Sequence, residues 1–185
     1  MSAKAEARLT RAQAEGRSYA LPDNAESRAF QQKFRSLRHE PGALLEALHL
    51  AQEAFGYLPK PVLGWIAQEL KIPRNQVYTT ATFYHMLSVK PEAKYVIRVC
   101  DCLSCYLEGG EAVLNAVSKA AQVPPGETLS NDGLFSLHTT SCIGLCEQAP
   151  AMMINQERYG LLNPEKVDWI ISSLRRKEGT IEGGG

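Results

Sequence analysis

The sequence predicts an α+β protein in which a bundle of four short helices precedes a small α/β domain. Between residues 24 and 90, apolar residues recur at helical spacing in segments that are separated by proline and glycine. Beyond Pro91 the pattern changes to short runs of β-branched and aromatic residues, which are typical of strands. All five cysteines lie in this second part, between residues 100 and 146. The two halves are therefore expected to differ in both architecture and chemistry.

The helical half, residues 24–90, is expected to start at Asn24, a residue type suited to capping a helix. Phe30 and Phe34 then recur at helical spacing. Proline is favoured in the first turn of a helix, and three prolines mark the expected starts of the next helices: Pro41, Pro61 and Pro73. We interpret an aromatic cluster near the end of the fourth helix as core packing: Tyr78, Phe83 and Tyr84.

The α/β half, residues 91–177, is expected to contain strands at 95–99, 134–140, 151–154 and 158–162. Helices are expected to follow Gly109 and Asn163. The cysteines should then all lie in loops at strand ends. The two ends of the chain have few large apolar groups, which predicts a flexible or partner-bound arm at residues 1–23 and a flexible tail at residues 178–185.

Composition excludes several classes of function. Twenty basic and twenty acidic side chains balance, so the chain lacks the basic excess that is typical of nucleic-acid binding. No apolar run approaches the roughly 20 residues of a membrane-spanning helix, and the N-terminus has no secretory signal pattern. We expect a cytoplasmic protein that contacts a membrane, if at all, through a larger complex.

The cysteine spacing predicts a metal or redox centre. Cys100 and Cys105 form one pair with four residues between them, and Cys142 and Cys146 form a second pair with three. Each pair is expected on its own loop, so the two can converge as a [2Fe–2S] cluster requires, because each iron takes two thiolates. Glycines at three positions would let backbone N–H groups approach the sulfurs: Gly109, Gly110 and Gly144.

Other metal and redox sites remain open alternatives at this point. Structural zinc also takes four cysteines, although its pairs usually have a different spacing. Cys102 and Cys105 form a C-x-x-C pair, so a thiol–disulfide enzyme would use these two and leave Cys142 and Cys146 without a role. A Rieske centre needs two histidines in the cysteine loops. The four histidines lie elsewhere, in the helical half or in a strand: His39, His49, His85 and His138.

No nucleotide-binding fingerprint accompanies the cysteines. The sequence contains no G-x-G-x-x-G, no P-loop and no G-x-S-x-G. The chain is therefore not expected to bind NAD, flavin or ATP by itself, and an electron carrier of this kind would need a partner.

In order along the chain, several segments resemble one known family. They are LLEALHLAQEAFGYLP (44–59), VYTTATFYH (77–85), VCDCLSC (99–105) and CIGLCEQAP (142–150). The chain is similar to the small [2Fe–2S] subunit of the NADH-dehydrogenase module of respiratory complex I and its counterparts in NAD-linked hydrogenases and formate dehydrogenases. The resemblance implies a thioredoxin-like [2Fe–2S] ferredoxin domain at residues 91–177, with Cys100, Cys105, Cys142 and Cys146 as ligands.

The same resemblance implies a function and partners. The chain would be a non-catalytic electron-transfer subunit of an NAD(P)-dependent oxidoreductase. It would dock onto a flavoprotein subunit that binds FMN and NAD(P)H, alongside further Fe–S or hydrogenase or dehydrogenase subunits. The alternative is a stand-alone thioredoxin-like thiol–disulfide or zinc-binding module.

An extra cysteine distinguishes the first loop. The segment VCDCLSC places Cys102 between the two expected ligands and resembles segments of the hydrogenase and formate dehydrogenase members. We expect Cys102 to pack as a small apolar group or to donate a weak S–H bond, and not to bind iron.

Overall fold

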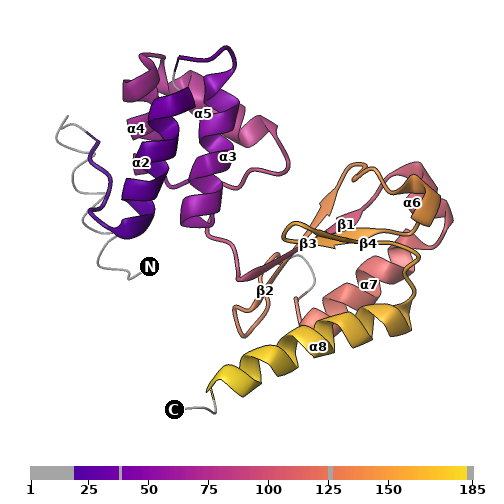
Figure 1. Ribbon diagram of the computed structural model, residues 1–185. Helices are drawn as coiled ribbons and strands as arrows, with labels where there is room; N and C mark the ends of the chain where they lie inside the picture. The colour runs from indigo at the N-terminus through magenta and orange to yellow at the C-terminus, as the bar shows by residue number, and fades with distance from the viewer. Residues whose placement is uncertain (1–18, 38, 125–126, 183–185) are drawn as a thin grey trace. The chain divides into compact units, whose positions relative to one another are not determined.

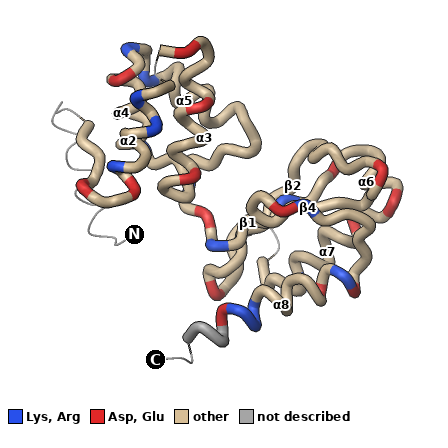
Figure 2. Tube along the Cα trace, viewed as in Figure 1, with Lys and Arg blue, Asp and Glu red and all other residues tan. Residues whose placement is uncertain are grey.

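The computed structural model describes residues 19–37, 39–124 and 127–182 (Figure 1). The chain divides into two units, Met1–Pro91 and Glu92–Gly185, and each is described here by itself. Across the described ranges, no helix has the length and apolar character needed to cross a membrane. Basic and acidic side chains are interspersed over both units (Figure 2).

The first unit is helical. Its elements are α2 (Ala25–Leu37), α3 (Ala43–Phe55), α4 (Lys60–Leu70) and α5 (Arg74–Phe83). The predicted cap of the first helix is confirmed, because the Ser27 N–H donates to Asn24 Oδ1 at 2.7 Å. The other three helices begin within two residues of their predicted prolines.

Aromatic side chains from three helices hold this unit together. Phe30 and Phe34 of α2 are almost fully buried, and their rings lie 5.4 and 4.9 Å from the ring of Trp65 in α4. Phe55 of α3 meets the Phe30 ring edge-on at 5.6 Å. Fully burying one such side chain stabilises a fold by about 1.5–3 kcal/mol, so these rings anchor the helices to one core.

The prediction that the aromatic cluster of α5 is core was wrong. Tyr78, Phe83 and Tyr84 are 46%, 72% and 41% exposed. The inward positions of α5 are Val77 and Ala81, one helical turn apart, and both are fully buried. The aromatic residues follow these positions or end the helix, so they remain on the surface.

The described end of the N-terminal arm packs on the helical unit. A Cβ at Gly64 of α4 would lie 2.6 Å from the ring of Tyr19, so the ring rests directly on the helix backbone. The guanidinium of Arg74 covers the same ring at 4.7 Å. The rest of the predicted arm, residues 1–18, lies outside the described residues.

The second unit is built on a four-stranded sheet. Its strands are β1 (Tyr95–Cys100), β2 (Phe135–Thr140), β3 (Met152–Ile154) and β4 (Glu157–Tyr159). Their order is β2-β1-β3-β4, with β1 and β2 parallel and the other pairs antiparallel. Three strands match their predicted ranges to within a residue at each end. The fourth starts and ends earlier than expected, because the turn at Asn155 (φ 54°) is tight.

The helices of this unit are α6 (Leu103–Leu107), α7 (Gly110–Ala121) and α8 (Pro164–Glu182). Helix α7 connects the parallel strands β1 and β2, and it packs beside α8 (Figure 1). Ile97 and Val99 of β1 share a buried core with Val113 of α7 and Ile170 of α8. Side chains alternate along a strand, so Arg98 and Cys100 lie on the opposite face of the sheet.

Helix α8 includes residues 178–182, which the sequence pattern assigns to the tail; the flexibility of that tail stays a prediction. Glu178 explains the extension, because its carboxylate accepts hydrogen bonds from Lys94 Nζ at 2.6 Å and from the Tyr95 hydroxyl at 2.8 Å. These partners lie more than 80 residues away in sequence, so local composition could not reveal them. Residues 183–185 lie outside the described residues.

Candidate metal centre

The first pair of thiols is buried. Cys100 is the last residue of β1, and its N–H donates to the Ala151 carbonyl at 3.0 Å. Cys105 lies inside the short helix α6, and both cysteines are only 2% exposed. The prediction that every cysteine lies in a loop was therefore wrong for this pair. A five-residue helix is too short to leave a periodic apolar pattern, so no sequence signal indicates α6.

The second pair of thiols is exposed on the loop that follows β2. The sulfurs of Cys142 and Cys146 lie 3.4 Å apart. The N–H of Gly144 points at Cys142 Sγ, also at 3.4 Å, which confirms the predicted role of this glycine. Gly144 has φ 77°, a conformation that strongly favours glycine and that turns its N–H back toward the sulfur.

The two loops meet in space. Ile143 and Leu145, which lie between the second pair of thiols in sequence, pack against Cys100 and Cys105 and the neighbouring Ala151. Cys102, half-buried at the N-cap of α6, joins the same contact. The structure thus brings together the four cysteines predicted as ligands, and the extra cysteine lies beside them.

The thiols differ in acidity. Burial, together with a hydrogen bond to Cys100, raises the pKa of Cys105 to about 11. The Gly144 N–H lowers the pKa of Cys142, whereas the hydrogen bond that Cys146 makes to Cys142 raises the pKa of Cys146. Metal binding requires thiolates, and the lowered pKa of Cys142 favours its thiolate form.

Glycine lets the backbone behind the first pair pack closely. A Cβ at Gly110, the first residue of α7, would lie 2.7 Å from the carbonyl oxygen of Cys105 and 3.6 Å from that of Cys100. The sequence predicts that the Gly110 N–H approaches the sulfurs. That prediction stays untested, whereas the close approach of these carbonyls shows that the absent side chain of Gly110 lets α6 and α7 meet closely.

The donor set suits a two-iron centre. The four predicted ligands lie as one buried pair and one exposed pair, and Ile143 and Leu145 of the second loop pack against the buried pair. A [2Fe–2S] cluster takes two thiolates on each iron, so this arrangement fits it.

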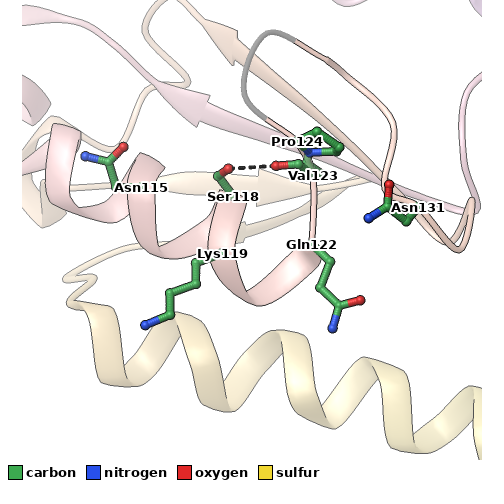
Figure 3. Close-up of a pocket in the computed structure, with 7 residues that line it drawn as sticks. All are labelled: Asn115, Ser118, Lys119, Gln122, Val123, Pro124 and Asn131. Atoms are coloured by element: carbon green, nitrogen blue, oxygen red, sulfur yellow. Dashed lines mark hydrogen bonds between the residues drawn. The ribbon is translucent and has the colours of Figure 1, made fainter.

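A concave region lies at the C-terminal end of α7 (Figure 3). It is an open depression of about 400 Å³, in which Ser118 Oγ donates to the Val123 carbonyl at 2.9 Å. Its lining is mostly amide and hydroxyl side chains: Asn115, Ser118, Lys119, Gln122, Val123, Pro124 and Asn131. None of these is a cysteine, so this depression is separate from the thiol site.

Comparison with known proteins places the sequence in a defined group. Residues 30–175 match the family of thioredoxin-like [2Fe–2S] ferredoxins. An NADH-quinone oxidoreductase subunit of Rhizobium meliloti (strain 1021) is 38% identical over 136 residues, which are 74% of this chain and 80% of that protein. The NADP-reducing hydrogenase subunit HndA of Solidesulfovibrio fructosivorans is 35% identical over 141 residues, 76% of this chain and 82% of that one.

A solved structure has a similar fold. The crystal structure of an NAD+-reducing [NiFe]-hydrogenase in the air-oxidized state superposes with a TM-score of 0.64 at 30% identity, covering 76% of this chain. The match spans 24% of that hydrogenase chain. These relatives are subunits or chains of oxidoreductases, which favours the electron-transfer prediction over the stand-alone thiol–disulfide or zinc module.

Proposed function

Because the chain belongs to the thioredoxin-like [2Fe–2S] ferredoxin family, we propose that it is the non-catalytic electron-transfer subunit of an NAD(P)-linked oxidoreductase complex. The observation that carries the proposal is that the loop holding the exposed thiol pair packs, through Ile143 and Leu145, against the buried thiol pair. A [2Fe–2S] cluster, when bound, takes up and releases electrons one at a time.

The residues proposed to hold the cluster are Cys100, Cys105, Cys142 and Cys146. Strand β1 fixes Cys100, and the short helix α6 brings Cys105 back toward it. The Gly144 N–H donates toward Cys142 Sγ, and such a donor stabilises thiolate charge and helps to set the reduction potential. Ile143 and Leu145 reduce the access of water to the buried pair.

The proposed partner is a flavoprotein subunit that binds FMN and NAD(P)H, with further Fe–S or hydrogenase or dehydrogenase subunits beyond it. The chain has no nucleotide fingerprint of its own, so the electrons must come from or go to a separate protein. The helical unit, proposed to be a four-helix bundle, presents Tyr78, Phe83 and Tyr84 on its surface, and exposed aromatic residues are enriched at protein interfaces. We place the assembly in the cytoplasm.

The test is an absorption spectrum of protein purified without oxygen. We expect charge-transfer bands in the visible region that bleach with dithionite, together with iron and acid-labile sulfide. A colourless protein that retains zinc, or one with thiol–disulfide exchange activity and no iron, would contradict the proposal.

A further inference from the structure

Arg98 is a buried cation two residues before Cys100 on β1. It lies in the middle of β1, opposite His138 of β2 and Met153 of β3, and is only 6% exposed. Its neighbours in sequence, Ile97 and Val99, point into the helix-covered core, so Arg98 points to the other face of the sheet. Cys100 lies on that same face, two residues along the strand, which separates the two Cα atoms by about 6.6 Å.

The burial of this guanidinium is costly and only partly compensated. Burial lowers the pKa of Arg98, and the carboxylate of Glu92 opposes that effect. Glu92, whose side chain is 8% exposed, is itself shared with His138, at 3.0 Å from His138 Nε2. Within the described residues, Arg98 Nε has no hydrogen-bond partner. A buried cation of this kind is expected where a further negative charge lies nearby.

We propose that Arg98 is a fixed positive charge that tunes the centre held by Cys100, raising its reduction potential. The inference rests on the proposed function. Reduction adds one electron from an external donor to a site that is already anionic, so a nearby cation stabilises the reduced form more than the oxidised form. Glu92 has the opposite sign and lies beside Arg98, so it lowers the potential by offsetting part of that charge.

The experiment uses the full-length, iron-loaded chain and four variants. Arg98→Met removes the charge, Arg98→Lys keeps it, and Glu92→Gln removes the opposing charge. Arg158→Met is the matched control, because Arg158 of β4 lies on the same face of the sheet, in register with Met153 but two strands from β1 and exposed. The measurements are iron content, the EPR spectrum after reduction and the midpoint potential in a dye-mediated titration.

We expect Arg98→Met to shift the potential to a more negative value and Glu92→Gln to shift it to a more positive one. Arg98→Lys should stay near the wild-type value, and Arg158→Met should leave it unchanged. Shifts of opposite sign in the potentials of Arg98→Met and Glu92→Gln would show that the two charges act electrostatically. Loss of a purely structural ion pair would instead shift the potential of both variants in the same direction.

Three results would overturn the inference. They are an iron-loaded Arg98→Met variant with the wild-type potential, shifts of the same sign in Arg98→Met and Glu92→Gln, or a shift as large in Arg158→Met. If Arg98→Met fails to load iron, Glu92→Gln decides the question, since an unchanged or lowered potential in that variant contradicts the role of Arg98. A wild-type chain that binds no cluster would instead contradict the proposed function.

Discussion

At the scale of single residues, Cys102 lies beside the proposed ligands, within hydrogen-bond reach of Cys100 and Cys142, but at a different point of the backbone. It is the N-cap residue of α6, and its carbonyl accepts the N–H of Tyr106 at 2.9 Å. Cys100 ends strand β1 and Cys105 lies inside α6, whereas Cys102 directly precedes the first residue of α6. The half-buried Cys102 side chain packs at the edge of the same apolar contact.

The first prediction compares two cysteine variants. Cys102→Ala should keep its iron and shift the reduction potential only modestly, because it removes a neighbour of the site and not a ligand. Cys100→Ala should lose or remodel the centre. Iron content and EPR spectra of the two variants, expressed side by side, provide the measurement. An iron-free Cys102→Ala beside a coloured Cys100→Ala would show that the ligands of the first loop have been assigned wrongly.

The second prediction concerns Gly110. Glycine to alanine within a helix normally stabilises by roughly 0.5–1 kcal/mol. At Gly110 the new methyl group would meet the Cys105 carbonyl at 2.7 Å, so we expect destabilisation of about 1–3 kcal/mol and weaker iron retention. Urea denaturation and iron content should show both effects. Glu111→Ala, at the exposed next position of α7, is the control; equal behaviour of the two variants would contradict the packing argument.

Several site residues could be predicted from sequence, because the signal for each of them lies in the residues next to it. The run of β-branched residues before Cys100 indicates a strand, and Gly144 between two cysteines indicates a tight turn. Contacts across the fold could not be predicted in this way. The packing of Gly110 on Cys105 and the burial of Arg98 both depend on how β1, α6 and α7 meet in three dimensions.

At the scale of elements, hydrogen bonds join the end of α8 to the start of β1. Glu178 accepts hydrogen bonds from Lys94 and Tyr95, and the one from Lys94 is the main reason that the pKa of Glu178 is lowered. The same contact raises the pKa of Lys94. In sequence, Glu178 directly follows three basic residues near the end of α8. Periodicity predicted the apolar face of α8 but not this ion pair, so the predicted helix ended too early.

The third prediction is a pH dependence. The pKa of Glu178 is lower in the folded state than in the unfolded state, so its contribution to stability is present above the ordinary glutamate pKa of about 4.3 and is lost as pH falls further. Glu178→Gln should therefore be less stable than wild type at pH 7, and the difference should shrink toward pH 3. Urea midpoints at the two pH values provide the measurement.

A double-mutant cycle controls for other effects of the Glu178 substitution. Lys94→Met combined with Glu178→Gln should lose less stability at pH 7 than the sum of the two single variants, because both remove the same contact. Strictly additive losses, or a difference between wild type and Glu178→Gln that is independent of pH, would show that the ion pair does not stabilise the end of α8.

At the scale of the whole molecule, the two units have separate cores. The core of the helical unit is formed by residues before Pro91, and the core of the second unit by residues from Ile97 onward. The thiols belong entirely to the second unit. The helical unit contributes none of the proposed ligands, which is why we assign it to contacts with the partner.

The fourth prediction tests whether the second unit binds the cluster by itself and whether the helical unit is needed to contact the partner. A fragment of residues 92–185 should fold and bind iron, because its core and its cysteines are complete. It should, however, fail to assemble with the flavoprotein subunit, as judged by co-purification with the full-length chain as control. The full-length chain alone should show no NADH binding in calorimetry. Tight NADH binding, or normal assembly of the fragment, would contradict the assignment.

The central claim is that one two-iron cluster is held by the two thiol pairs, and a spin count tests it most directly. The iron-loaded chain is reduced with dithionite, and its EPR signal is integrated against measured iron and sulfide. The thiols provide two pairs and no ligands for a second cluster, so we expect about two irons, two sulfides and one spin-half centre per chain. About two spins per chain, a [4Fe–4S] signal or stoichiometric zinc without iron would contradict the claim.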